Sequence, residues 1–296
     1  MSVAVSIVIR CRDESRHLGP VLDAVLDQAG APSFEVLALD SGSRDGTLAL
    51  LSARPVRIEH LRPESFSYGR ALNRGAALAR GELLVYLSAH CRPLGPGWLA
   101  DLVAPFAVVE VVATFGRQVP MRSVNPIEAI TTARNFPPDP PAGVRFSTAN
   151  AAVRRTAVLT RPFDEEIAIA EDHLWACGVR APGGIVYRPA AAVAHSHPMS
   201  LAHWRARFYA HGLAAAYARR RYGVELPWGA PDDTAAGIVR RGTGAFLRLA
   251  RGLARDRELA ALAQLPAYAL ARTLAYARGL RDGARRYESS GERAAG

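Results

Sequence analysis

The chain of 296 residues contains no lysine, so its formal net charge of +10 comes from arginine alone. This absence disfavours a nucleotidyltransferase that relies on a glycine-rich, lysine-bearing phosphate loop after the first strand. The arginine excess reflects a GC-rich genome that encodes every cation as arginine, an anionic partner such as a phosphate-bearing ligand or a membrane surface, or both. No basic motif with interleaved aromatic residues accompanies the charge, so we expect no nucleic-acid partner.

Cysteine is scarce, and long apolar runs are missing. Cys11, Cys91 and Cys177 are widely scattered, which fits neither a disulfide framework nor a zinc-ribbon spacing and favours a reducing compartment. No stretch reaches the ~18 consecutive apolar residues of a membrane span. The first ten residues lack the basic lead and cleavage site of a signal peptide. We therefore expect a cytoplasmic protein, either freely dissolved or peripheral at the inner face of the plasma membrane.

The first half of the chain alternates strand-like and helix-like segments. The patterns predict strands over 3–9, 35–40, 56–61, 82–87 and 108–115, and helices over 18–28, 45–53 and 68–80. Strands separated by helices of this length predict an α/β fold with a mostly parallel central sheet covered on both faces. Ligands of such sheets bind beyond the carboxyl ends of the strands. The candidate binding loops are therefore 10–16, 40–47 and 88–93.

The second half is more helical. Helical spacing predicts one helix over 163–180 and a longer one over 201–223, before a linker at 225–233. The remaining Ala-, Leu- and Arg-rich sequence predicts two or three amphipathic helices. We expect one domain over residues 1–224 and a basic α-helical extension over 225–296. The extension packs on the body of the protein or on a second copy, or lies on an anionic membrane.

Three short stretches carry chemistry. In "LDSGSRDGT" (39–47), Asp40 ends a strand and Asp45 caps a helix; this is either a ligand-binding turn rich in backbone N–H groups or simply a strand–helix turn. In "AEDH" (170–173), the adjacent acids Glu171 and Asp172 belong either to a solvated helix face or, given their apolar neighbours, to a pocket. "YLSAHCRP" (86–93) follows a buried strand. There we expect Cys91 to be a buried thiol rather than a nucleophile.

Together these stretches resemble the family 2 glycosyltransferases of GT-A (Rossmann-like) fold. "LDSGSRDGT", "NRGAALARGE", "FDE…AEDH" and "YRPAAAVAHSH" stand in the family's order within residues 3–215. The spelling "DSGS", with "FSYGRALNRG" and "GRQVP", is most similar to the bacterial rhamnosyltransferase-like branch. The resemblance implies an inverting transfer of a sugar, for example the deoxysugar rhamnose. The donor would be a dTDP- or UDP-linked sugar, and the acceptor a hydroxyl on a glycan, a lipid-linked carrier or a natural product.

The resemblance also implies roles for individual residues. Asp172 would be the general base that removes the acceptor proton, with Glu171 orienting it or binding the acceptor. The donor nucleotide would be bound by residues of the candidate loops and of the helix predicted over 68–80, namely Arg10, Asp13, Glu14, Asp40, Ser41, Arg70, Asn73, Ser88 and Ala89.

The cation site is where the chain departs from the family, which typically has Asp-x-Asp at Ser88-Ala89-His90. The first hypothesis is a divalent cation, Mn²⁺ or Mg²⁺, held by His90, His195 and His197, although imidazole suits Mn²⁺ or Zn²⁺ better than Mg²⁺. The second is that Arg70, Arg92 or a protonated histidine neutralises the leaving diphosphate without a metal. The third is that catalysis is lost and the protein is a sugar-nucleotide-binding or scaffold protein.

Overall fold

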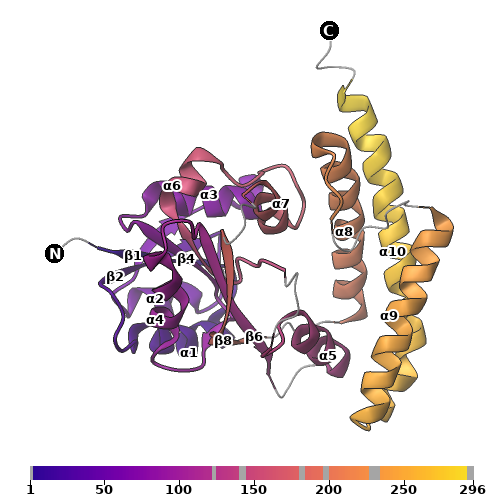
Figure 1. Ribbon diagram of the computed structural model, residues 1–296, viewed down its shortest axis with the longest axis horizontal. Helices are drawn as coiled ribbons and strands as arrows, with labels where there is room; N and C mark the ends of the chain where they lie inside the picture. The colour runs from indigo at the N-terminus through magenta and orange to yellow at the C-terminus, as the bar shows by residue number, and fades with distance from the viewer. Residues whose placement is uncertain are drawn as a thin grey trace. The chain divides into compact units, whose positions relative to one another are not determined.

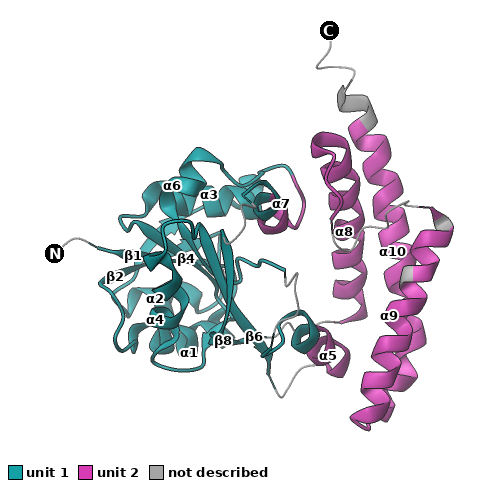
Figure 2. Ribbon diagram, viewed as in Figure 1, with its two compact units in different colours: residues 1–121, 132–166, 175–196 teal, residues 122–131, 167–174, 197–296 magenta. Residues whose placement is uncertain are grey.

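The computed structural model describes residues 3–121, 125–139, 145–179, 184–195, 200–226 and 234–291. The chain divides into two compact units (Figure 2). Unit 1 carries the β-sheet and comprises Met1–Met121, Thr132–Glu166 and Trp175–Ser196. Unit 2 is helical and comprises Arg122–Thr131, Ile167–Leu174 and His197–Gly296.

The described part of unit 1 contains an eight-stranded sheet in the order β3-β2-β1-β4-β7-β6-β8-β5 (Figure 1). Its strands are β1 (Val5–Cys11), β2 (Phe34–Asp40), β3 (Arg57–His60), β4 (Leu83–Ser88), β5 (Arg92–Pro93), β6 (Ala113–Pro120), β7 (Asn150–Arg154) and β8 (Ile185–His195). The strands β1 to β4 are mutually parallel, as are β6 and β8, whereas β7 runs against both of its neighbours. The carboxyl ends of β1, β2, β4 and β8 therefore lie at one edge of the sheet.

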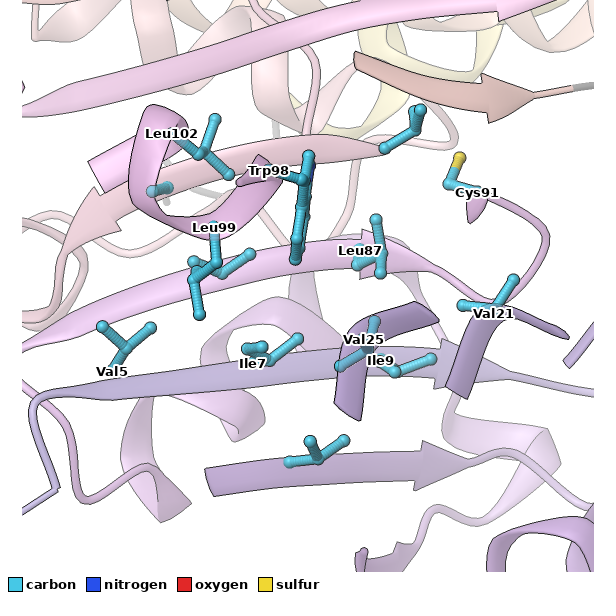
Figure 3. Close-up of a cluster of buried hydrophobic side chains, with 14 of the residues drawn as sticks. Val5, Ile7, Ile9, Val21, Val25, Leu87, Cys91, Trp98, Leu99 and Leu102 are labelled. Carbon is cyan, nitrogen blue, oxygen red and sulfur yellow. The ribbon is translucent and has the colours of Figure 1, made fainter. Parts of the chain in front are cut away.

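Helices cover both faces of this sheet, as expected for strands that are apolar throughout. On one face, Ile7 and Ile9 of β1 pack with Val25 of α1 and Leu99 of α4 (Figure 3). The intervening Val8 points to the other face and packs with residues of α3. The helices of this unit are α1 (Ser15–Leu26), α2 (Thr47–Ser52), α3 (Tyr68–Leu78), α4 (Trp98–Val103) and α6 (Arg155–Thr160), with short 3₁₀ turns at Pro63–Ser65 and Ala104–Ala107.

Unit 2 is built around α8 (Leu201–Tyr222), α9 (Ala235–Arg255) and α10 (Leu259–Gly291), with parts of α5 (Pro126–Asn135) and α7 (Glu171–Gly178). α8 and α10 approach each other closely, because a Cβ added at Gly279 would lie only 2.0 Å from the Tyr209 carbonyl oxygen. A cluster of buried hydrophobic side chains joins Trp204 of α8, Leu253 of α9 and Leu265 of α10. Among the described helices, none combines the length and the apolar character that crossing a bilayer requires.

The α/β class, the mostly parallel sheet and the helices after it confirm the predicted fold, but two predicted elements were wrong in extent. The strand predicted over 108–115 begins only at Ala113, since Val108 and Val109 lie exposed in a turn. The helix predicted over 163–180 is α7 alone. Asn73 engages the backbone of Phe163, and the chain reaches α7 through Ala170 at a left-handed φ of 76°, which interrupts any helix.

Candidate active site

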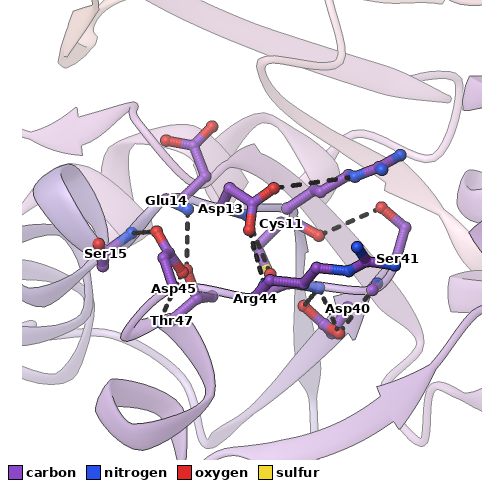
Figure 4. Close-up of polar contacts among 12 residues, drawn as sticks. Cys11, Asp13, Glu14, Ser15, Asp40, Ser41, Arg44, Asp45 and Thr47 are labelled. Atoms are coloured by element: carbon purple, nitrogen blue, oxygen red, sulfur yellow. Dashed lines mark hydrogen bonds and ion pairs between the residues drawn. The ribbon is translucent and has the colours of Figure 1, made fainter.

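The first two loops at the carboxyl edge of the sheet are joined by reciprocal hydrogen bonds (Figure 4). The Asp13 N–H donates to Ser43 Oγ at 3.0 Å, and the Arg44 N–H donates to Asp13 Oδ1 at 2.7 Å. Asp13 sits at a φ of 52°, a left-handed conformation that aspartate tolerates better than most residues. The loops that follow β1 and β2 are therefore fixed to each other without any ligand.

Asp45 adds a further connection between these loops. Its carboxylate accepts the N–H of Thr47, the first residue of α2, and also the N–H of Ser15, the first residue of α1. The N-cap of α2 is Gly46 and not the predicted Asp45, which contacts the helix start from one position earlier. The hydroxyl bond from Thr47 is the largest cause that lowers the pKa of Asp45 well below its usual range, while the slight burial acts against it. One side chain thus satisfies N–H groups at the starts of two helices.

Asp40 and Ser41 are buried at the end of β2. The Asp40 carboxylate accepts the N–H groups of Gly42 at 3.1 Å and Ser43 at 3.2 Å, and lies 3.7 Å from His60 Nδ1. Both the N–H and the hydroxyl of Ser41 donate to the Cys11 carbonyl oxygen. The N–H groups of Gly42 and Ser43 therefore point at Asp40 itself, which is the geometry of a side-chain-stabilised turn.

Two imidazoles face each other at the ends of β4 and β8. His90 Nδ1 lies 2.7 Å from Glu14 Oε1, and His195 Nδ1 lies 2.6 Å from Gln118 Oε1. The rings stack with centroids 5.2 Å apart and planes 16° apart. One ligand atom from each of His90, Cys91 and His195 lies within 4.8 Å of the others. The structure thus brings together two predicted metal residues and a thiol that sequence reasoning had assigned no metal role.

This donor set fits a divalent cation of borderline character. A neutral imidazole that donates from Nδ1 to an oxygen acceptor carries its lone pair on Nε2, which is the atom that would then bind a metal. Nitrogen donors suit Mn²⁺ or Zn²⁺ better than Mg²⁺, and sulfur suits Zn²⁺. Burial raises the pKa of the Cys91 thiol far above its ordinary value, so a metal would have to displace its proton. His197, the third predicted ligand, lies outside the described residues.

Ser88 and Ala89 form the turn that holds His90 in place. The Ser88 carbonyl accepts the Cys91 N–H at 2.8 Å, and the Ser88 N–H donates to Ala149. Ala89 is fully buried. Within "SAHC", the side chains of Ala89 and Cys91 therefore belong to the core, whereas Ser88 and His90 are half-buried.

Arg10, Arg70 and Asn73 lie around the start of α3. The Arg10 guanidinium lies 5.3 Å from the centre of the Tyr68 ring. Arg70 Nε donates to Glu165 at 2.9 Å, and Asn73 Nδ2 donates to the same carboxylate at 3.0 Å. Burial acts to raise the pKa of Glu165, but the hydrogen bonds from Asn73 and Arg70 outweigh it and the pKa is lowered.

Glu165 is a residue that sequence reasoning missed. Its partners are about 90 positions away in the chain (95 for Arg70 and 92 for Asn73), and the only signal for it was the acidic "FDEE" stretch itself. In this structure Arg70 and Asn73 fasten the 163–165 segment to α3. Their predicted contacts to the donor stay a prediction.

Glu171 and Asp172 occupy the first turn of α7 and belong to unit 2. Glu171 is buried and Asp172 half-buried, with Asp172 Oδ1 accepting the His173 N–H at 2.7 Å. Leu174, one turn on, packs against Ala214 of α8. Carboxylates in the first turn of a helix meet the positive end of its dipole. Ala170, held at a left-handed φ, sets the direction in which both acids leave the backbone.

Comparison with known proteins gives concordant results. The model of the family described as Glycosyl transferase family 2 matches residues 6–158, more than half of the chain. The O-antigen chain rhamnosyltransferase RfbN of Salmonella typhimurium is 27% identical over 195 residues, which cover 60% of this chain and 61% of that protein. The chain spans less than two thirds of the length of the curated relatives it matches.

Solved structures share the fold at low identity. The mannosyltransferase PcManGT of Pyrobaculum calidifontis, in complex with GDP-Man and Mn²⁺, aligns with a TM-score of 0.58 at 19% identity, over 96% of this chain and 86% of that chain. Glucosyl-3-phosphoglycerate synthase of Mycobacterium tuberculosis, in complex with Mn²⁺, UDP-Glc and phosphoglyceric acid, gives a TM-score of 0.57 at 18% identity, over 76% and 81%. These likenesses confirm the predicted GT-A fold.

Proposed function

The chain belongs to glycosyl transferase family 2, and from that premise we propose that it is a glycosyltransferase. The reaction would be an inverting transfer of a deoxysugar such as rhamnose from a thymidine or uridine diphosphate donor to an acceptor hydroxyl. The observation that carries the proposal is the convergence of Asp40, Glu14, His90 and His195 at one edge of the sheet. In open α/β sheets this edge is where nucleotides bind. The likeness to an O-antigen rhamnosyltransferase supports the choice of sugar.

The donor nucleotide would bind across the loops that follow β1, β2 and β4. Asp13, Asp40 and Ser41 would line the base and ribose, and Ser88 and Ala89 would present backbone groups. Because Asp13 and Asp40 are already held by hydrogen bonds, little side-chain entropy remains to be lost when the nucleotide binds. Relatives that use uridine donors often carry a second acid where this chain has Ser41. The serine is therefore compatible with a thymidine donor as well.

The leaving diphosphate needs positive charge. We propose that His90 and His195 hold a divalent cation through Nε2, with Glu14 and Gln118 orienting the two rings. The cation would neutralise the developing charge on the diphosphate. Mn²⁺ should be preferred over Mg²⁺ because both proposed ligands are nitrogen atoms. If no metal is needed, Arg70, Arg92 or a protonated histidine would neutralise the diphosphate directly.

The acceptor must lose a proton as its oxygen attacks the anomeric carbon. Asp172 would take that proton, and Glu171 would orient the base or hold an acceptor hydroxyl. Attack from the face opposite the leaving diphosphate inverts the configuration, so one base suffices and no covalent intermediate forms. The bond that forms joins acceptor oxygen to sugar carbon, and the bond that breaks frees the nucleoside diphosphate.

The proposal is tested by melting the purified chain with a panel of sugar nucleotides, each with and without Mn²⁺, followed by assays of nucleotide release. A donor at a hundred times its dissociation constant should stabilise by about 2.7 kcal/mol, which raises the melting temperature by several degrees. Binding without release in the presence of saccharide acceptors would instead indicate a sugar-nucleotide-binding protein. No shift and no release with any donor would overturn the proposed function.

A further inference from the structure

We propose that unit 2 binds the surface of an anionic lipid bilayer through the outer faces of α9 and α10. α9 carries Arg240, Arg241, Arg248, Arg251 and Arg255 in 21 residues, and it contains no acidic residue. The two helices form a hairpin: α10 begins four residues after α9 ends, and Gly242 of α9 packs against Thr273 of α10. The proposal is independent of the donor site.

The outer face of α9 is basic and partly apolar. Leu253 is fully buried against α10, whereas Arg240, Arg248 and Arg251 lie exposed on the opposite side. Within the part of the chain that the structure describes, these three arginines take part in no ion pair. Leu247, one residue before Arg248, is 48% exposed on the same side. Charge and apolar surface thus occur together on one helix face, as in helices that lie in a membrane interface.

α10 adds an exposed apolar row. Leu259, Leu270 and Leu274 are 72%, 61% and 60% exposed, and Ala263, also exposed, fills the gap between the first two at helical spacing. The opposite side of the helix is the packed one, where Leu265 and Tyr268 join the core of unit 2. No charged residue occurs between Leu259 and Ala271. This row would sit in the boundary between head groups and acyl chains.

The charge pattern favours lipid over a second copy of the chain. A two-fold dimer through this hairpin would bring the arginines of one copy against the same arginines of the other, which is unfavourable. Lipid phosphates provide the complementary charge, and arginine can reach them while its methylene groups stay among the acyl chains. Each cation near such a surface contributes about a fivefold increase in binding.

Sedimentation of the full chain with sucrose-loaded vesicles tests the proposal. We expect binding to phosphatidylcholine vesicles that contain phosphatidylglycerol, weak binding to pure phosphatidylcholine, and loss of binding as salt rises. The variant R240Q/R248Q/R251Q should lower the partition coefficient about a hundredfold. Its matched control is R16Q/R62Q/R80Q, which removes the same charge from exposed arginines of unit 1 and should change binding less than about twofold.

A second variant tests the contribution of the exposed leucines of α10 separately from that of the arginines. L270Q/L274Q should weaken vesicle binding while leaving its salt dependence in place, and circular dichroism checks that each variant keeps its helices. The proposal is overturned if the chain binds no vesicles, if it binds neutral and anionic vesicles equally, or if both arginine triples lose the same amount. It is also overturned if the chain is a dimer that binds no lipid and if L270Q/L274Q converts this dimer to monomers.

Discussion

Glu14 and His90 lie 2.7 Å apart, from Oε1 to Nδ1, although 76 positions separate them in the chain. The pair joins the loop after β1 to the loop after β4 and orients the His90 ring. A carboxylate that holds an imidazole in this way raises its quality as a metal ligand. The acid of the family's usual motif is missing from position 90, but an acid still lies directly behind the imidazole that replaces it.

Glu14→Gln should weaken Mn²⁺ binding by about ten- to a hundredfold, because it removes the charge that orients His90. Titration calorimetry with Mn²⁺ measures this directly. Asp23→Asn is the matched control, since Asp23 is a carboxylate of unit 1 that pairs with Arg54 at the surface. Equal affinities in all three proteins would show that the Glu14 charge does not strengthen metal binding.

Asp172→Asn should lower the rate of transfer by about 10²–10⁴-fold, because the acceptor proton then has no base to receive it. The dissociation constant of the donor should stay unchanged. Glu171→Gln, at the adjacent position, is the comparison: it should raise the KM of the acceptor more than it lowers kcat. Full activity of Asp172→Asn would place the base elsewhere.

Glu165→Gln should make stability less dependent on pH. The pKa of Glu165 is lowered on folding, so the carboxylate stabilises the native state above its ordinary pKa, and this contribution disappears as the pH falls through the lowered value. At neutral pH the variant should be less stable by about 0.5–1 kcal/mol, a small amount because the pair with Arg70 is partly exposed. Urea unfolding at pH 7 and near pH 3 measures the difference, with the exposed Glu64→Gln as control. A difference that persists at the lower pH would contradict this assignment.

Gly116→Ala should destabilise unit 1 by about 3 kcal/mol or prevent folding, because the core cannot accept the added methyl group. Its Cβ would lie 1.9 Å from the Ala191 carbonyl oxygen and 2.3 Å from Asn150 Nδ2, at the point where the β6–β8 register shifts. Gly95→Ala is the control, since nothing lies within 4 Å of a Cβ there. Thermal melting of the two variants should separate them clearly.

The sequence predicted what periodicity and strand ends can determine. The buried run before Ser88 and the acid after "EVLAL" identify the ends of two strands from local pattern alone. These two ends lie at the same edge of the sheet because the strands are parallel. The pairing of Glu14 with His90 was not predictable, since it depends on how two loops meet. Nor was the irregular stretch before α7, because it depends on Asn73, a residue 90 positions earlier. The apolar spacing over 163–180 favours a helix, but the hydrogen bonds between Asn73 and the Phe163 backbone hold the start of this segment in a non-helical conformation.

The hydrogen bonds between the loops after β1 and β2 couple the motions of these loops. Asp13 bonds to Ser43 and Arg44, and Asp45 bonds to the first residues of two helices, so an opening that breaks these bonds together frees both segments at once. The amides of Asp13, Ser15 and Arg44 should therefore exchange with solvent in one cooperative opening event rather than independently. A nucleotide that contacted only one of these loops would slow exchange in the other as well.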